Sequence, residues 1–194
     1  LRRQPPGRAA VEDHLGRIWL GTRNGLNIYD EISNSFIRVP LGNFSKNIYT
    51  PAIAEDTNGN IWVGTDGIGL LKVRIDSSRK VPAFHVTQFL KSDSDSSSIP
   101  SNTVFSLRTD LLNNLWIGTE AGLCKIDASN LRDSKTKIRF AHICIIENNK
   151  CVLDNERVSE IINHGNQLWV GTKGRFIYCL DYTNPKNKTW KTIA

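Results

Sequence analysis

The sequence predicts an all-β fold, a β-propeller made of four four-stranded blades. A pentad of the form aliphatic-Trp-aliphatic-Gly-Thr recurs four times in 194 residues, and its tryptophans are separated by 43, 54 and 53 residues. A repeat of about that length is typical of one propeller blade. No segment has the apolar period of a capped amphipathic helix, so we expect strands only. The four copies are Ile18–Thr22, Ile61–Thr65, Leu115–Thr119 and Leu168–Thr172.

A short apolar run that ends in a cluster of Asn, Asp and Gly precedes each pentad. In the second repeat this run is 53–60, Ile-Ala-Glu-Asp-Thr-Asn-Gly-Asn. Such a pattern indicates a first strand followed by a hairpin turn. The pentad is therefore expected to form the second strand of each blade. Because its residues are strong β-formers on both faces, we expect it to be buried on both sides.

A Gly-bearing turn follows each pentad, and then a third strand that ends in Asp. The expected third strands are 26–30, 70–76, 123–127 and 176–181. A more variable segment leads to a fourth strand marked by an aromatic residue. These aromatics are Phe36, Phe84 or Phe89, Phe140, and Trp190. The four repeats thus extend over about 8–46, 47–98, 99–154 and 155–194.

The tryptophans of the pentads are interpreted as the structural core of the repeats, packed between blades: Trp19, Trp62, Trp116 and Trp169. A ring of that size buries roughly 150–250 Å², which stabilises each blade by several kcal/mol at about 25 cal/mol per Å². Four repeats are also the smallest number with which propellers close. The last repeat has its own fourth strand over 188–193, so no strand is visibly shared between the ends. We therefore favour an arc of a larger propeller over a closed four-bladed ring.

Composition indicates a globular domain rather than a nucleic-acid or membrane protein. The net charge is +6, but the basic residues are scattered over all repeats without a Lys/Arg run. We therefore expect no nucleic-acid partner. No run approaches the roughly 18 apolar residues of a membrane span, so no direct membrane insertion of this segment is expected. Residues 1–8 look like a linker, and the chain has no Met, so we expect a piece of a longer product.

The four cysteines show no metal-binding spacing. Cys124 and Cys179 fall in corresponding strands of neighbouring repeats, where small buried hydrophobic residues are expected. Cys144 and Cys151 are seven positions apart, on either side of a turn at 147–150. An oxidising compartment would allow them to form a disulfide, and otherwise they are free thiols.

No motif requires catalysis, a cofactor or a metal. The sequence has no Gly-x-Ser-x-Gly elbow and no phosphate-binding Gly-rich loop. Residues 56–60, Asp-Thr-Asn-Gly-Asn, resemble the start of a calcium loop, but the downstream bidentate Glu is missing. A hairpin turn is the better interpretation. A hydrolase or lyase would need converging acids, and the first strands offer only Glu55, Asp56 and Glu160.

The repeats resemble the two-component regulator propeller repeat. The family pattern is Ile-x-x-Ile-x-x-Asp-x-x-Gly-Asn-aliphatic-Trp-aliphatic-Gly-Thr-x-x-Gly-Leu. Residues 53–65, with Gly69 and Leu70, follow it nearly throughout, and 101–104, Ser-Asn-Thr-Val, match the usual start of a first strand. The first and fourth repeats depart more from the pattern. In the fourth repeat, Arg175 and Phe176 replace the usual Gly-Leu.

The resemblance implies the periplasmic sensor region of a hybrid two-component histidine kinase/response regulator of the Bacteroides type. In that family two seven-bladed propellers precede further sensor domains, a membrane span and a kinase. The arc is therefore expected to belong to a seven-bladed propeller and to have the remaining blades and the downstream sensor domains as partners. The ligands in that family are commonly breakdown products of polysaccharides. The fragment is expected to be non-catalytic.

A ligand is expected at the rim where the turns after the pentads meet the segments that open each blade. Charged, amide and Tyr groups there would suit an oligosaccharide or a uronic acid. One alternative is that these turns are polar only because they are solvated. A second alternative is that the chain is a scaffold that binds protein partners or forms a homodimer. The candidate ligand-binding residues are Arg23, Asn24, Asn47, Tyr49, Asp66, Ser101, Asn102, Glu120, Asn155, Arg157, Lys173 and Arg175.

Overall fold

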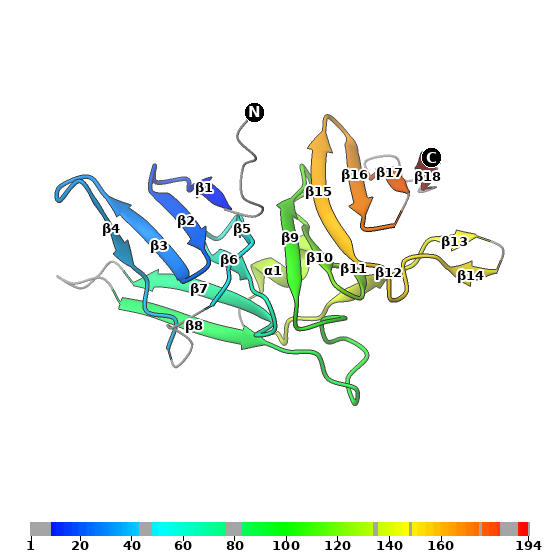
Figure 1. The fold of residues 1–194 in the computed structure, drawn as a ribbon, viewed down its shortest axis with the longest axis horizontal. Helices are drawn as coiled ribbons and strands as arrows, with labels where there is room; N and C mark the ends of the chain where they lie inside the picture. The colour runs from blue at the N-terminus through cyan, green and yellow to red at the C-terminus, as the bar shows by residue number, and fades with distance from the viewer. Residues whose placement is uncertain are drawn as a thin grey trace.

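The computed structural model describes residues 9–42, 48–76, 83–133, 136–147, 149–174, 176–182 and 190–193. It contains four antiparallel four-stranded sheets and one additional two-stranded hairpin. The sheets follow one another around an arc, from β1–β4 at one end to β15–β18 at the other (Figure 1). The predicted all-β propeller of four four-stranded blades is confirmed.

The strands of each sheet are hydrogen-bonded in chain order. Blade 1 consists of β1 (Ala10–Glu12), β2 (Ile18–Thr22), β3 (Gly25–Asp30) and β4 (Ser35–Arg38). Blade 2 consists of β5 (Ala52–Glu55), β6 (Ile61–Gly64), β7 (Leu70–Asp76) and β8 (Ala83–Phe89). Blade 3 consists of β9 (Val104–Thr109), β10 (Leu115–Thr119), β11 (Gly122–Ile126) and β12 (Ala141–Ile143). Blade 4 consists of β15 (Val158–His164), β16 (Gln167–Thr172), β17 (Ile177–Asp181) and β18 (Lys191–Ile193).

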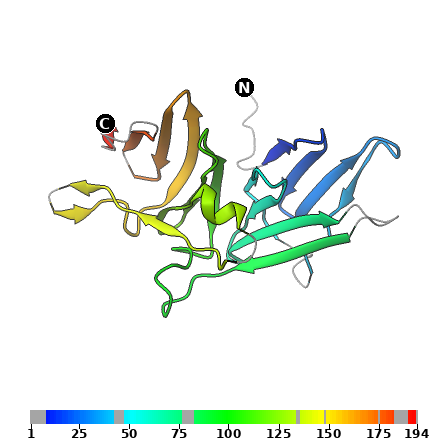
Figure 2. The same cartoon turned by 180° about the vertical axis from the view of Figure 1, so that it is seen from behind.

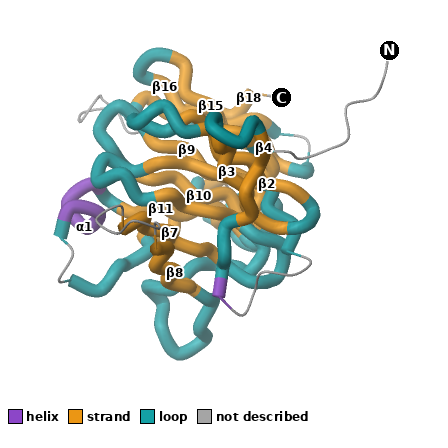
Figure 3. Tube along the Cα trace, turned by 90° about the vertical axis from the view of Figure 1, so that its left-hand side faces the viewer, coloured by secondary structure: helices purple, strands orange, loops and turns teal. Residues whose placement is uncertain are grey.

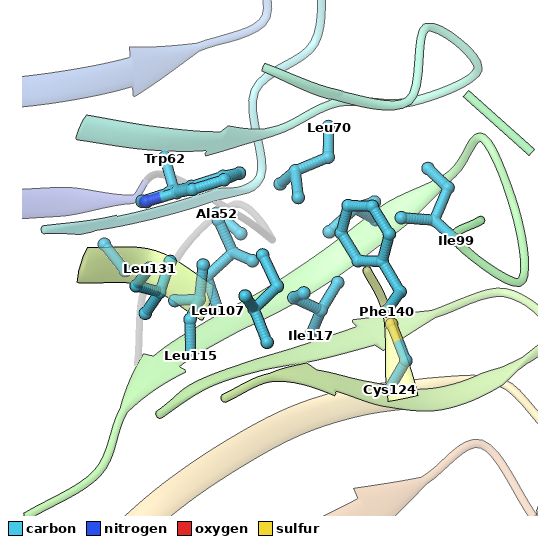
Figure 4. Packing of buried hydrophobic residues seen from close by; sticks show 13 residues of the cluster. Ala52, Trp62, Leu70, Ile99, Leu107, Leu115, Ile117, Cys124, Leu131 and Phe140 are labelled. Carbon is cyan, nitrogen blue, oxygen red and sulfur yellow. The ribbon is translucent and has the colours of Figure 1, made fainter. Parts of the chain in front are cut away.

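The pentads form the second strands, as predicted, and the tryptophans of the first three pack against the following blade. Trp19, Trp62 and Trp116 are almost completely buried. Trp62 of blade 2 shares a hydrophobic cluster with Leu107 and Leu115 of blade 3. Figure 4 shows its ring between the strands of the two blades, close to Ala52 and Leu131. The Trp of each of the first three blades is therefore a filler between blades.

The arc is held together between consecutive blades. Strand β5 contacts β1 and β2, β9 contacts β5 and β6, and β15 contacts β9 and β10. No strand pair of the described residues joins blade 1 to blade 4 to a similar extent. The two blades lie at opposite ends of the molecule in Figures 1 and 2. The described blades thus form an open arc, in agreement with the prediction. That the arc belongs to a seven-bladed propeller stays a prediction.

Three local features differ from the sequence-based expectation. A one-turn helix, α1 (Ala128–Arg132), lies between β11 and β12 of the otherwise all-β blades. It places the buried Leu131 beneath Trp62, and Figure 3 shows it at the edge of the strands. The fourth strand of blade 3 begins at Ala141, directly after the buried Phe140. The segment that leads to blade 4 forms a hairpin of β13 (Ile146–Glu147) and β14 (Lys150–Cys151), which projects from the blades (Figure 2).

An aspartate in the first hairpin turn orders each of the first three blades. Asp56 accepts hydrogen bonds from the backbone N–H of Asn58 (2.9 Å) and Asn60 (3.0 Å) and from the indole of Trp62 (2.8 Å). Asp13 and Asp110 make the same bonds to their own turns and to Trp19 and Trp116. The hairpin-turn interpretation of 56–60 is therefore confirmed.

Cys144 and Cys151 form a disulfide that closes the projecting hairpin, with Cα atoms 5.3 Å apart. Of the two alternatives left open by the sequence, the structure has the disulfide. Cys124 and Cys179 are free and buried, as expected. Burial raises the pKa of both thiols. In the Cys179 thiol, the positive charge of Lys191 opposes this effect.

Replacing both Cys144 and Cys151 with Ser is expected to lower the free energy of unfolding by about 2 kcal/mol, because a short closed loop no longer restricts the unfolded chain. Urea unfolding of the oxidised protein and of the double variant measures this difference. Under a reducing agent the two proteins should unfold at the same urea concentration. A difference that persists after reduction would contradict the explanation.

Candidate functional site

The central side of the arc contains a cavity of about 720 Å³ that all four repeats help to line. Five of the predicted ligand-binding residues are among its lining residues. Two further residues, Thr103 and Phe105, complete the lining. The five predicted residues are Arg23, Tyr49, Asp66, Glu120 and Arg157.

Backbone pairing explains why these residues meet. Within blade 2 the N–H of Asp66, in the turn after the pentad, donates to the carbonyl of Tyr49, which precedes β5 (3.1 Å). Glu120 and Thr103 are joined in the same way in blade 3 (3.0 Å). Each blade therefore brings its second-to-third turn next to the segment that opens its first strand. This is the rim geometry that the sequence predicts.

The Thr of each pentad fixes the turn after it, and in the first three blades this turn carries a lining residue. Its hydroxyl donates to the carbonyl that closes the turn. This bond occurs in all four blades, so the turns have a common anchor. The pairs are Thr22–Gly25 (2.9 Å), Thr65–Gly69 (2.6 Å), Thr119–Gly122 (2.9 Å) and Thr172–Phe176 (3.0 Å).

Arg157 has the chemistry of a ligand-binding side chain. Its guanidinium carbon lies 3.7 Å from the ring centroid of Phe105, a cation–π contact. Its Nε lies 3.7 Å from Oε2 of Glu120, which is beyond hydrogen-bonding distance. This Nε is buried and donates to no described acceptor. The ring of Phe105 thus packs against the face of the guanidinium, and the Nε–H in the guanidinium plane remains able to donate a hydrogen bond to a ligand.

The other residues that line the cavity are polar. Asp66 accepts a hydrogen bond from the hydroxyl of Thr103 (3.3 Å), which in turn accepts one from the N–H of Gly67 (3.1 Å). Arg23 is exposed at the blade 1 turn, and Tyr49 is half-buried. Two arginines and two carboxylates line the cavity, so their formal charges cancel.

Five other predicted site residues that the structure describes are not among the residues that line the cavity. Asn24 accepts from Arg38, and Asn102 accepts from the N–H of Lys91 (2.7 Å). Ser101 accepts from the N–H of Thr103, and Lys173 donates its backbone N–H to Arg157. Asn155 is exposed with a positive φ of 60°, and Asn47 and Arg175 lie outside the described residues. The sequence-based set was thus broader than the group that the fold brings together.

Phe105 was missed by the sequence analysis because it lies at a β-bulge. Gly118 pairs with Ser106 and Thr119 pairs with Val104, so Phe105 is the additional residue in β9. A bulge breaks the two-residue alternation on which sequence arguments rest. Thr103 belongs to the Ser-Asn-Thr-Val segment at 101–104, whose pattern indicates only the start of a first strand.

The three first-strand acids considered for hydrolysis lie outside the cavity lining. Asp56 binds its own turn, and both oxygens of Glu55 bind the blade 1 turn at His14. Glu160 is exposed on the outer face of blade 4. Within the described ranges no three His, Cys, Asp or Glu side chains group in a way that would hold a metal ion. Nor does any described helix have the length and apolar character of a membrane span.

Residues 43–67, which include the blade 2 pentad, match the family described as "Two component regulator propeller". This segment of the chain is thus similar to a two-component regulator propeller repeat. The matched segment ends at Gly67, directly after the cavity residue Asp66. No curated protein sequence matches the chain.

Solved structures with similar folds are much longer than this propeller-repeat chain. PorZ, a surface component of the type-IX secretion system of Porphyromonas gingivalis, matches 96% of the chain over 26% of its own length (TM-score 0.67, 20% identity). An ancestral GH74 enzyme matches 91% of the chain over 24% of its own length (TM-score 0.54, 16% identity). A B. thetaiotaomicron extracellular domain, described as that of hybrid two component system BT4673, matches 94% over 28% (TM-score 0.44, 17% identity). The chain spans about a quarter of each of these structures. At such identities, the likeness to PorZ and to the GH74 enzyme shows the fold alone.

Proposed function

We propose that this propeller-repeat chain is a non-catalytic, ligand-sensing part of an extracytoplasmic two-component receptor, and that its central cavity binds an oligosaccharide. The observation that carries the proposal is the cavity lined from all four repeats. A ligand there contacts several blades at once, so its binding energy can bias their relative arrangement. The family match supports a place in two-component signalling.

The size and lining of the cavity support a sugar ligand. Its volume of about 720 Å³ lies within the range of small-molecule sites. The hydroxyl of Tyr49 and the charged groups of Arg23 and Asp66 offer donors and acceptors. Arg157, with a buried Nε that lacks an acceptor, suits a hydroxyl or a carboxylate such as that of a uronic acid.

The disulfide supports an extracytoplasmic, periplasmic location. Disulfides persist in oxidising compartments such as the bacterial periplasm and are rare in the cytosol. Cys144–Cys151 closes the hairpin between blades 3 and 4. By the same proposal, the histidine kinase lies in another part of the parent protein.

Binding can be tested with a glycan array on the intact ectodomain, followed by calorimetry with the oligosaccharide that it identifies. Arg157→Gln is expected to weaken binding at least about tenfold, because a hydrogen bond to a charged group contributes about 1.5–3 kcal/mol. Arg23→Ala and Tyr49→Ala should weaken it as well. Arg74→Gln is the matched control, because it removes one positive charge from an exposed position of β7 outside the cavity.

Unchanged oligosaccharide affinity in the Arg157, Arg23 and Tyr49 variants would refute the cavity as the site. Release of reducing sugar from a bound glycan would refute the non-catalytic assignment and point to a hydrolase.

A protein-interaction scaffold is the second candidate function. The exposed apolar side chains of blade 1 favour it, since Ile32 in the β3–β4 turn and Phe36 and Ile37 on edge strand β4 are open to solvent. An unpaired edge strand with apolar residues can pair with a partner strand. Binding of a protein partner without any binding to the glycan array would favour this candidate.

A further inference from the structure

A second cavity, of about 510 Å³, lies between blades 1 and 2 and is called the blade 1–2 groove below. One wall contains Ile28 and Ile37, which pair across β3 and β4, and the other contains Ile75 and Phe84, which pair across β7 and β8. Figure 1 shows these two pairs of strands next to each other. Residues 15–18, from the first hairpin turn of blade 1 and the start of β2, also line the groove. Its volume lies within the range of small-molecule sites.

The blade 1–2 groove is separate from the central cavity. Arg17, which directly precedes β2, lines the groove, whereas Arg23, which directly follows β2, lines the central cavity. No described residue lines both. A ligand in the groove is therefore an additional function, and it does not depend on the proposed binding of an oligosaccharide.

The walls of the groove are apolar, and part of them is open to solvent. Ile37 is 50% exposed and Leu15 is 63% exposed. Ile28, Ile75 and Phe84 are half-buried and pack against the hydrophobic core between the two blades. Exposed apolar side chains that converge from several elements mark a binding groove. Since core packing fixes the deeper residues, the groove is already formed before a ligand enters.

Two carboxylates determine the charge that a ligand meets in the groove. Asp30 and Glu31, at the end of β3, are both among the lining residues. Asp30 lies two residues after Ile28 and therefore on the same face of the strand. The cation of the lining, Arg17, donates from Nε to the buried carboxylate of Asp13 (2.6 Å), which compensates its charge.

Hydrogen bonds hold the carboxylate of Asp30 in place and in its ionised form. It accepts from the hydroxyl of Ser33 (2.5 Å) and from the backbone N–H groups of Ile32 and Ser33 (both 3.3 Å). These bonds, the hydroxyl of Ser33 first among them, lower the pKa of Asp30. The groove thus combines apolar walls with a fixed negative charge at the end of β3.

We propose that the blade 1–2 groove is a second ligand site, and that it binds a small organic cation with an apolar body, such as an arylalkylamine. The apolar body lies between the isoleucines of blade 1 and the ring of Phe84, and the ammonium group binds Asp30 and Glu31. Charge complementarity selects this class of ligand, because an anion of the same shape would face two carboxylates. The apolar walls in turn disfavour a small hydrated cation, which would lose water without gaining a partner there.

Three indoles of similar shape and different charge test the proposal: tryptamine, 3-ethylindole and indole-3-propionate. In a ligand-observed NMR titration of the unmutated protein, the cation tryptamine should bind saturably. The anion indole-3-propionate should bind at least about tenfold more weakly, because it cannot bond to the carboxylates. Neutral 3-ethylindole should lie between them. Equal affinities for the cation and the anion, or no binding of tryptamine at millimolar concentration, would overturn the proposal.

Variants of the groove locate the site. Glu31→Gln should weaken tryptamine binding several-fold and leave 3-ethylindole binding unchanged, and adding Asp30→Asn should weaken tryptamine further. Ile37→Trp puts a larger side chain into the groove and should abolish binding of both compounds. Asp154→Asn is the matched control, because it removes a negative charge from an exposed position outside the groove. Tryptamine affinity that the groove variants leave at the level of this control would overturn the proposal.

A second copy of the chain is the competing occupant of the groove. Light scattering on the unmutated protein and on Ile37→Trp tests this alternative. A doubled mass that Ile37→Trp abolishes, with tryptamine affinity that falls as protein concentration rises, would assign the groove to self-association and overturn the proposal. The same monomeric mass for both proteins is the expected result.

Discussion

Trp62→Ala should destabilise the protein by about 3–5 kcal/mol, the range found when a buried aromatic residue is truncated. The indole of Trp62 is fully buried, stacks on Phe89 with ring centroids 5.6 Å apart and donates to Asp56. Its removal leaves a cavity between blades 2 and 3, where the side chains of both blades pack (Figure 4). Urea unfolding followed by circular dichroism measures the loss.

Phe36→Ala is the control for the Trp62 variant. It also removes an aromatic ring from a strand, but Phe36 is 51% exposed on edge strand β4. Its loss should cost less than about 1 kcal/mol, as for most surface substitutions. Equal destabilisation by the two variants would mean that Trp62 does not fill an interface between blades.

Asp56→Ala is expected to cost about 3–4 kcal/mol, because buried donors that lose their acceptor each cost about 1–3 kcal/mol. The buried carboxylate accepts from the Trp62 indole, from the Asn60 amide and from two backbone N–H groups of the turn. The same unfolding experiment measures this effect. A loss confined to a few tenths of a kcal/mol would contradict the role given to this carboxylate.

Calcium provides a separate check on Asp56. If the turn is ordered by its own hydrogen bonds, millimolar Ca²⁺ should not change the melting temperature of the unmutated protein. A calcium-dependent increase that Asp56→Ala abolishes would instead make 56–60 a metal loop.

Two different physical signals determine which parts of the fold the sequence predicts. The four blades follow from the spacing of the pentads, because each repeat folds against its neighbour in the same way. The five predicted residues of the cavity follow from a second signal. In each blade the turn after the pentad lies on the same rim as the segment that precedes the first strand. Helix α1 could not be predicted in this way, because its five residues are too few to show a 3.6-residue period.

The buried aspartates illustrate a signal that was present in the sequence but incompletely used. Each lies six residues before its Trp, as in Asp13–Trp19, Asp56–Trp62 and Asp110–Trp116. The Asn, Asp and Gly cluster of 56–60 indicates a hairpin turn, but by itself it does not connect the carboxylate with the indole. The constant spacing across three repeats would have suggested that contact.

Hydrogen bonds also shift the pKa of Asp13. Burial would raise this pKa, but hydrogen bonds from Trp19, Arg17 and Leu15 lower it overall.

The consecutive packing of the blades has a consequence for how the molecule loses structure. Since each sheet is supported by its immediate neighbours, its stability is close to a sum over nearest-neighbour terms, as in other linear arrays. Blades 2 and 3 each have two such neighbours among the described sheets, whereas blades 1 and 4 have one. In the 194-residue chain, local unfolding should therefore require the least free energy in blades 1 and 4, and the backbone amides of blades 2 and 3 should stay protected from exchange longest.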